Sequence, residues 1–103
     1  MKELQEQVND FVKKYHLETS PELRYLDLVS EVGEVGKELL KGSHYGKEAF
    51  SKTEDLALEL GDVLFSLLCL SNCLDISLEE SLKQVLQKYE TRFQEKGNIG
   101  SGN

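Results

Sequence analysis

The sequence predicts an all-α fold, a four-helix bundle-like domain, on three observations. Apolar residues recur at steps of three and four along most of the chain, which is the helical period. Alternation of β-branched and polar residues is scarce, so a sheet has little room. The single proline, Pro21, stands at a predicted helix start. A chain of 103 residues forms one domain, which we place at residues 1–96, and the Gly/Ser/Asn tail, 97–103, is expected to be disordered.

The first two helices are predicted before residue 42. One apolar face extends over Glu3–His16 and predicts the first helix. The second is expected to begin at Thr19, Ser20 and Pro21, because Glu22 follows Thr19 by three residues as in a capping box. It should extend to Lys41, with Gly42 ending it.

The last two helices follow a polar loop that extends to about Thr53. The third helix is expected from about Glu54 to Cys73. Ser77 and Glu80 form a second capping box, which predicts that a fourth helix begins there and ends near Lys96.

Charge and apolar content limit the partners. Nineteen acidic and twelve basic residues give a net charge of −7, which repels duplex nucleic acid. The longest apolar run, Val63–Leu70, is far shorter than the roughly 20 residues that span a bilayer. The N-terminus has no signal-peptide pattern. We therefore expect a cytoplasmic protein that binds neither nucleic acid nor membrane. Because Val63–Leu74 is apolar around most of its circumference, we also expect a homodimer or homotetramer.

Acidic residues occupy one stripe on each of the two central helices. Helical geometry places Asp27, Glu31, Glu34 and Glu38 within roughly 60° of one another beside an apolar flank. The third helix repeats this with Asp55, Glu59 and Asp62. Both stripes therefore border a buried face.

The two stripes share a short repeat. Glu31–Val35 and Glu59–Val63 both read Glu, apolar, Gly, acid, Val. A glycine inside a helix costs roughly 0.5–1 kcal/mol relative to alanine, so we expect a close backbone approach at Gly33 and at Gly61. Packing the two helices together would bring four carboxylates to one locus.

A cation is needed to neutralise such a cluster. Carboxylate oxygens without cysteine or histidine suit a hard ion, Mg²⁺ first and Mn²⁺ second. The predicted ligands are Glu31, Glu34, Glu59 and Asp62. The alternative is that both stripes are solvated helix faces, the commoner position of acidic residues.

These motifs resemble those of a known family. Ser30–Glu34 and Glu59–Asp62 resemble the EExxE and ExxD signatures of MazG-type all-α nucleotide pyrophosphohydrolases, with 24 residues between Glu34 and Glu59. Lys88–Phe93 is similar to the family's C-terminal K-[FY]-E-x-R-F segment. Ser30 replaces the family's first Glu, which leaves the four metal-binding acids intact and puts in doubt any charge-tuning role of that position.

The resemblance implies a Mg²⁺-dependent enzyme that converts a nucleoside triphosphate and water to a monophosphate and pyrophosphate, clearing non-standard or excess nucleotides. Glu38 is one helical turn beyond Glu34 and is the candidate base, with a solvated glutamate as the alternative. Lys88 and Arg92 are candidate phosphate ligands, with ordinary surface charge as the alternative. Lys41 is a weaker candidate that would otherwise satisfy the helix dipole.

Two other functions remain open at this point. One is phosphoribosyl-ATP pyrophosphohydrolase, which has related helices and metal chemistry but a dedicated substrate. The other is a catalytically silent helical module whose acidic stripes bind a basic partner. The nucleobase and the residues that read it are not assigned.

Overall fold

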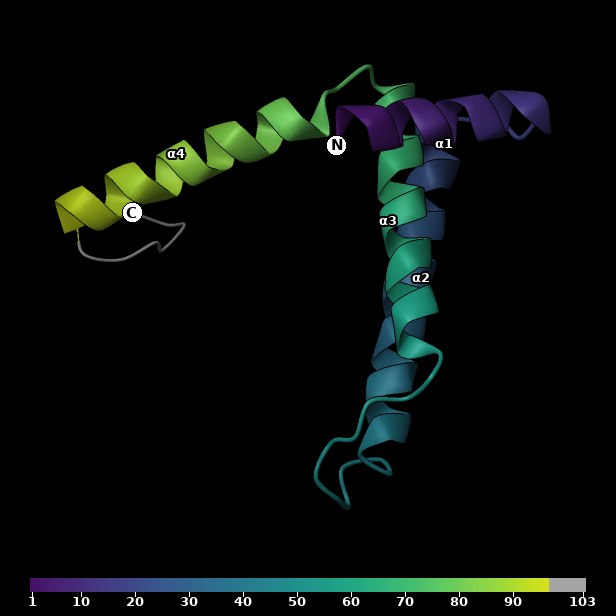
Figure 1. The fold of residues 1–103 in the computed structure, drawn as a ribbon, viewed down its shortest axis with the longest axis vertical. Coiled ribbons are helices and arrows are strands. Elements are labelled where there is room, and N and C mark those ends of the chain that lie inside the picture. The colour runs from purple at the N-terminus through teal and green to yellow at the C-terminus, as the bar shows by residue number, and fades with distance from the viewer. Residues whose placement is uncertain (97–103) are drawn as a thin grey trace.

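The computed structural model describes residues 1–96, and these form four helices and no strand (Figure 1). The helices are α1 (Lys2–Lys14), α2 (Pro21–Gly42), α3 (Leu56–Cys73) and α4 (Leu78–Lys96). The all-α prediction is confirmed, and each helix lies within two residues of its expected bounds. The predicted disordered tail, 97–103, lies outside the described residues.

Two helix starts are set by serine hydroxyls. The Ser20 side chain accepts a hydrogen bond from the backbone N–H of Leu23 at 3.3 Å, so Ser20 caps α2. The expected capping box on Thr19 is therefore wrong by one residue. Ser77 accepts from the N–H of Glu80 at 3.3 Å, which confirms the predicted start of α4.

The end of α2 is built around Gly42. This residue is buried and is the last residue of α2, so the helix ends at the predicted glycine. A Cβ atom there would lie 2.5 Å from Phe50 Cε1, and the Ser51 N–H donates to the Gly42 carbonyl at 2.8 Å. Glycine thus allows the following loop to pack against the helix. The chain reverses two residues later, where His44 has a positive φ of 48°.

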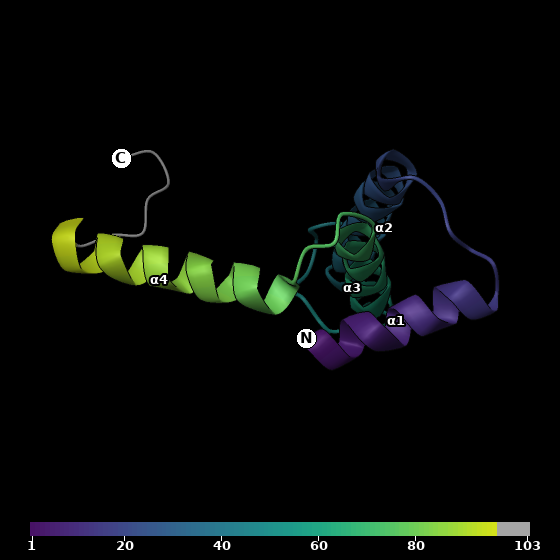
Figure 2. The same cartoon turned by 90° about the horizontal axis from the view of Figure 1, so that it is seen from above.

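Helices α2 and α3 lie side by side and antiparallel, and α1 crosses one end of the pair (Figures 1 and 2). Leu68 and Cys69 of α3 and Val12 of α1 are buried between them. The Phe11 ring meets the Phe65 ring edge-on, with centroids 6.0 Å apart. The core is therefore small and lies where α1 crosses α3.

Helix α4 extends away from the other three in both views (Figures 1 and 2). The Cα radius of gyration is consequently 17.0 Å, whereas a compact chain of this length has about 13 Å. The single chain is thus a three-helix unit with a projecting arm rather than a closed four-helix bundle.

The two repeated glycines do not have the close contacts that the sequence predicted. A Cβ added at Gly33 or Gly61 would meet nothing within 4 Å. That prediction is wrong for the single chain, because both glycines face open space.

Helix α3 is the one described helix that is long and apolar enough to span a membrane by length and composition. Core helices of globular proteins pass the same test. Here α3 carries two acids, Glu59 and Asp62, and packs along α2. We read it as the central helix of the fold.

Gln5 of α1 holds the junction between α3 and α4. Its side-chain amide donates to Ser71 Oγ at 3.2 Å, to Asn72 Oδ1 at 3.0 Å and to the Ile76 carbonyl at 2.9 Å. Its Oε1 accepts from the N–H of Leu78, the first residue of α4, at 2.8 Å. One side chain thus connects three helices.

We predict that Gln5→Ala lowers the free energy of unfolding by roughly 1–3 kcal/mol, because the bonds made by a half-buried amide are lost and their partners are left unpaired. Urea denaturation followed by circular dichroism measures this. Gln7→Ala is the matched control, since Gln7 is exposed on the same helix. Equal loss in both variants would contradict the role of Gln5.

Candidate metal centre

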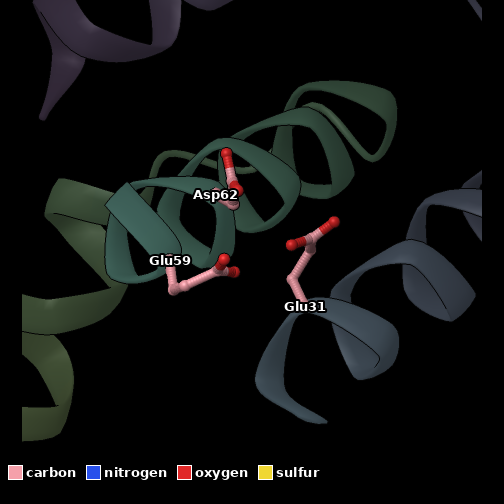
Figure 3. A group of neighbouring side chains, drawn as sticks. All are labelled: Glu31, Glu59 and Asp62. Atoms are coloured by element: carbon pink, nitrogen blue, oxygen red, sulfur yellow. The ribbon is translucent and has the colours of Figure 1, made fainter. Parts of the chain in front are cut away.

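Three carboxylates from two helices meet where α2 and α3 pack. Glu31 projects from the middle of α2 toward Glu59 and Asp62 near the start of α3 (Figure 3). Each offers an oxygen, and these oxygens lie within 4.8 Å of one another. Glu31 and Glu59 are half-buried, whereas Asp62 is exposed. We call these three residues the acidic cluster.

The acidic cluster lacks a basic side chain. Among residues 1–96, none of its three carboxylates forms an ion pair. Burial raises the pKa of Glu59, and the negative charges of Asp62, Glu34 and Glu31 raise it further. Glu59 is in the first turn of α3, where the helix dipole offsets only part of this repulsion. Three oxygen donors without a counter-charge fit a hard divalent cation.

Glu34 stands apart from the other predicted ligands. Its Oε1 lies 3.5 Å from Lys37 Nζ, one turn along α2. It is still near enough for its charge to raise the pKa of Glu59. The structure therefore brings three of the four predicted ligands together and leaves Glu34 beside them.

Glu38 is the buried acid of this region, with 7% of its surface exposed. Thr53 Oγ1 donates to its Oε2 at 2.7 Å, and Lys41 Nζ lies 3.3 Å from its Oε1. The Thr53 hydrogen bond is the main cause that lowers the pKa of Glu38, with Lys41 adding to it against the opposing effect of burial. Glu38 also raises the pKa of Lys41.

Thr53 was not among the predicted site residues. It lies 15 residues after Glu38 in a loop without regular secondary structure, so sequence periodicity does not predict its position. The contact depends on the antiparallel packing of α2 and α3, which returns this loop to the end of α2 (Figure 1). The sequence alone does not indicate it.

The predicted phosphate ligands lie on two separate elements. Lys41 is at the end of α2, next to Glu38. Lys88 and Arg92 are on α4, which points away from the acidic cluster in both views of the fold (Figures 1 and 2). Lys88 Nζ lies 5.3 Å from the centre of the Tyr89 ring on its own helix. Within residues 1–96 of one chain, α4 therefore carries these two basic residues away from the acidic cluster.

The fold and the acidic cluster together define an all-α domain whose paired helices present carboxylates suited to a hard cation. Comparison with known proteins specifies the family. Residues 19–96 match the MazG nucleotide pyrophosphohydrolase domain. The chain belongs to this family, whose members are hydrolases that act on acid anhydrides. The matched region contains every predicted site residue.

Two solved relatives share the fold. The uncharacterized protein YpjD of Bacillus subtilis is 38% identical over 96 residues, covering 89% of this chain and 85% of that protein. Its crystal structure, of a candidate pyrophosphatase, superposes with a TM-score of 0.74 at 39% identity, covering 89% of this chain and 94% of that one. The Bacillus-conserved MazG protein, a nucleotide pyrophosphohydrolase, has a TM-score of 0.72 at 30% identity, covering 85% and 86%.

We predict that Thr53→Val lowers Tm most at neutral pH. The folded-state pKa of Glu38 is lowered from 4.5, so the stability that its ionised form contributes is present above that value and is lost as the pH falls through the folded-state pKa. Removing the Thr53 donor removes part of this stability only where Glu38 is ionised. The Tm difference from the native protein should therefore shrink as the pH falls through the folded-state pKa of Glu38, which lies below 4.5.

Thermal melts from pH 3 to pH 8, in about one-unit steps, test this. Thr91→Val serves as the control, because the Thr91 hydroxyl donates to the Gln87 carbonyl of α4 rather than to a carboxylate. A Tm difference for Thr53→Val that stays constant with pH would contradict the assignment.

Proposed function

We propose that this protein hydrolyses a nucleoside triphosphate to a monophosphate and pyrophosphate in the presence of Mg²⁺, with Mn²⁺ as a substitute, and so clears non-standard or excess nucleotides. The acidic cluster is the observation that carries the proposal. Its three residues come from the two repeated acidic segments, and both segments lie inside the matched family region. A triphosphate is a polyanion, so an acidic protein needs a cation at this place to bind it.

In this proposal, Glu31, Glu59 and Asp62 hold the ion. Glu34 becomes the fourth ligand by breaking its ion pair with Lys37. Because this pair is exposed, breaking it costs little free energy. A divalent cation supplies positive charge that neutralises phosphate oxygens and lowers the pKa of water. Its donor set would be entirely carboxylate oxygen, which favours Mg²⁺ over zinc.

Glu38 is the proposed catalytic carboxylate. Its lowered pKa keeps it ionised at neutral pH, so it can accept a hydrogen bond from the attacking water. Thr53 and Lys41 fix its orientation. Lys41, whose pKa is raised, stays charged and is a proposed phosphate ligand at the same end of α2.

Lys88 and Arg92 remain proposed phosphate ligands, and they require another copy of the chain because α4 points away from the acids. We further propose a cytoplasmic homo-oligomer, a dimer or tetramer, that binds neither duplex nucleic acid nor membrane. The net charge of −7 supports the first exclusion.

We predict that a panel of canonical and modified nucleoside triphosphates with Mg²⁺ contains at least one substrate that yields pyrophosphate and monophosphate. Ion-exchange separation of the products measures the outcome. Release of single phosphate with a diphosphate product would contradict the proposed bond cleavage. Phosphoribosyl-ATP belongs in the panel, because its selective hydrolysis would favour the dedicated biosynthetic enzyme. If no nucleotide in the panel is hydrolysed, a catalytically silent acidic module would be favoured.

We predict opposite effects of Asp62→Asn in chelator and in Mg²⁺. Without metal, removing one charge relieves repulsion in the acidic cluster, so Tm is equal to or above that of the native protein. With saturating Mg²⁺ the native protein gains stability as RT ln(1 + [Mg²⁺]/Kd), and the variant gains much less. Hydrolysis should fall about 100-fold or more, since the charge of such an ion contributes several kcal/mol to catalysis.

Thermal melts in both conditions provide a readout that does not depend on turnover. Asp75→Asn is the matched control, because Asp75 is an exposed acid in the turn after α3 and outside the acidic cluster. If Asp62→Asn destabilised the protein in chelator and kept the full Mg²⁺ response, Asp62 would be a structural acid instead.

A further inference from the structure

A cavity of about 250 Å³ lies between α1, the loop that follows it, α2 and α3. Its lining includes Asn9 and Val12 of α1, Thr19 of the loop, Arg24 of α2 and Cys69 of α3. No residue of the acidic cluster lines it, so this cavity is separate from the candidate metal centre. We call it the Arg24 cavity.

A buried positive charge forms part of the cavity wall. Arg24 has 8% of its surface exposed, and its guanidinium donates one hydrogen bond, to the Leu17 carbonyl. In the part of the chain that the structure describes, it forms no ion pair with a carboxylate. The other buried charged side chain there, Glu38, has Thr53 and Lys41 as partners. Buried charges are normally paired, so Arg24 is the exception.

The nearest acids in the sequence leave the Arg24 charge unpaired. Glu18 lines the same cavity but is exposed, and Asp27 is exposed one turn further along α2. Neither carboxylate forms an ion pair with Arg24 in the described chain. A guanidinium has five N–H donors, and the Leu17 carbonyl occupies one of them. Arg24 therefore has both the charge and the donors to bind an anion in the cavity.

Two other polar side chains add donors to the same cavity. Asn9 and Thr19 are half-buried, and within residues 1–96 neither side chain makes a hydrogen bond. The charge of Arg24 also acts on the wall formed by α3, because burial raises the pKa of the Cys69 thiol and the guanidinium opposes this effect. Donors from α1, the loop and α2 thus line one space.

The remaining walls and the size of the cavity indicate the kind of anion. Val12, Pro21 and Cys69 give the cavity an apolar side. Binding sites for small molecules combine such apolar walls with a few polar groups that fix the ligand's orientation. A guanidinium binds a carboxylate through two parallel N–H···O bonds. A volume of about 250 Å³ is below that of most ligand pockets, so the ligand must be small.

We propose that the Arg24 cavity binds a small organic anion, whose carboxylate meets the Arg24 guanidinium and whose apolar part lies against Val12 and Cys69. The Asn9 amide and the Thr19 hydroxyl would donate to the remaining lone pairs of the carboxylate. Because the ligand would contact α1, α2 and α3 together, binding stabilises the packing of α1 on the other two helices. This site goes beyond the proposed function and does not depend on nucleotide hydrolysis.

Thermal melts with butyrate test the proposal, with butyramide as the uncharged control and sodium chloride keeping the ionic strength equal. Butyrate at ten times its Kd should raise the Tm of the native protein by roughly 5 °C, and butyramide should not. Arg24→Met should abolish this response. Lys13→Met should keep it, because Lys13 is an exposed positive charge on α1 and does not line the cavity.

Inorganic phosphate is the third probe. It offers the same negative charge to Arg24 without an apolar part. If phosphate stabilised the native protein as much as butyrate does, the cavity would be a general oxyanion site, and the proposal of an organic anion would be overturned.

Alkylation of Cys73 locates the ligand in the native protein and needs no variant that might misfold. Cys73 is exposed and lines the cavity, whereas Cys69 is buried. Bound butyrate should slow the reaction of Cys73 with iodoacetamide by up to about tenfold at ten times its Kd, as measured by mass spectrometry. A Tm gain with an unchanged Cys73 rate would place butyrate elsewhere. If neither the Tm nor the rate changed, the Arg24 cavity would not bind organic anions. Either result would overturn the proposal.

Discussion

The antiparallel packing of α2 on α3 is the constraint on which the rest of the structure depends. It sets Glu31 of one helix opposite Glu59 and Asp62 of the other, and it returns the loop after α2 to a place where Thr53 meets Glu38. The packing of α2 along α3 therefore brings like charges together. Burial of apolar surface along α3 offsets this repulsion, since the helix is apolar on nearly every other side. Folding thus creates a site with a deficit of positive charge.

Local sequence signals predicted the helices well because each depends on nearby residues. Ser77 with Glu80 predicted the start of α4, and the apolar period predicted α1 through Val8, Phe11 and Val12. Helix ends were less certain, as Thr19 and Ser20 illustrate: both are good caps, and only the backbone angle of Ser20 decides between them. The sequence did not indicate why residue 42 is a glycine. The reason is its close contact with Phe50, which lies in the loop after α2.

The acidic cluster was predictable in part, because repeated Glu, Gly and acid positions on two helices indicate which faces meet. The position of Glu34 beside the cluster was not predictable, since its side chain pairs with Lys37 on its own helix. The position of α4 was unpredictable for a further reason. Its amphipathic stripe requires a partner, but a single sequence does not say whether that partner is its own core or another chain.

Gln5 gives the arm a mechanical property. Arg92 lies roughly 20 Å along the helix axis from Leu78, where Gln5 fixes the start of α4. A tilt of about 10° at this joint would displace Arg92 by about 4 Å, more than the length of a hydrogen bond. The accuracy with which the far end of α4 is placed therefore depends on contacts near the N-terminus, namely the Gln5 amide at Leu78 and the Met1 ammonium beside Glu79.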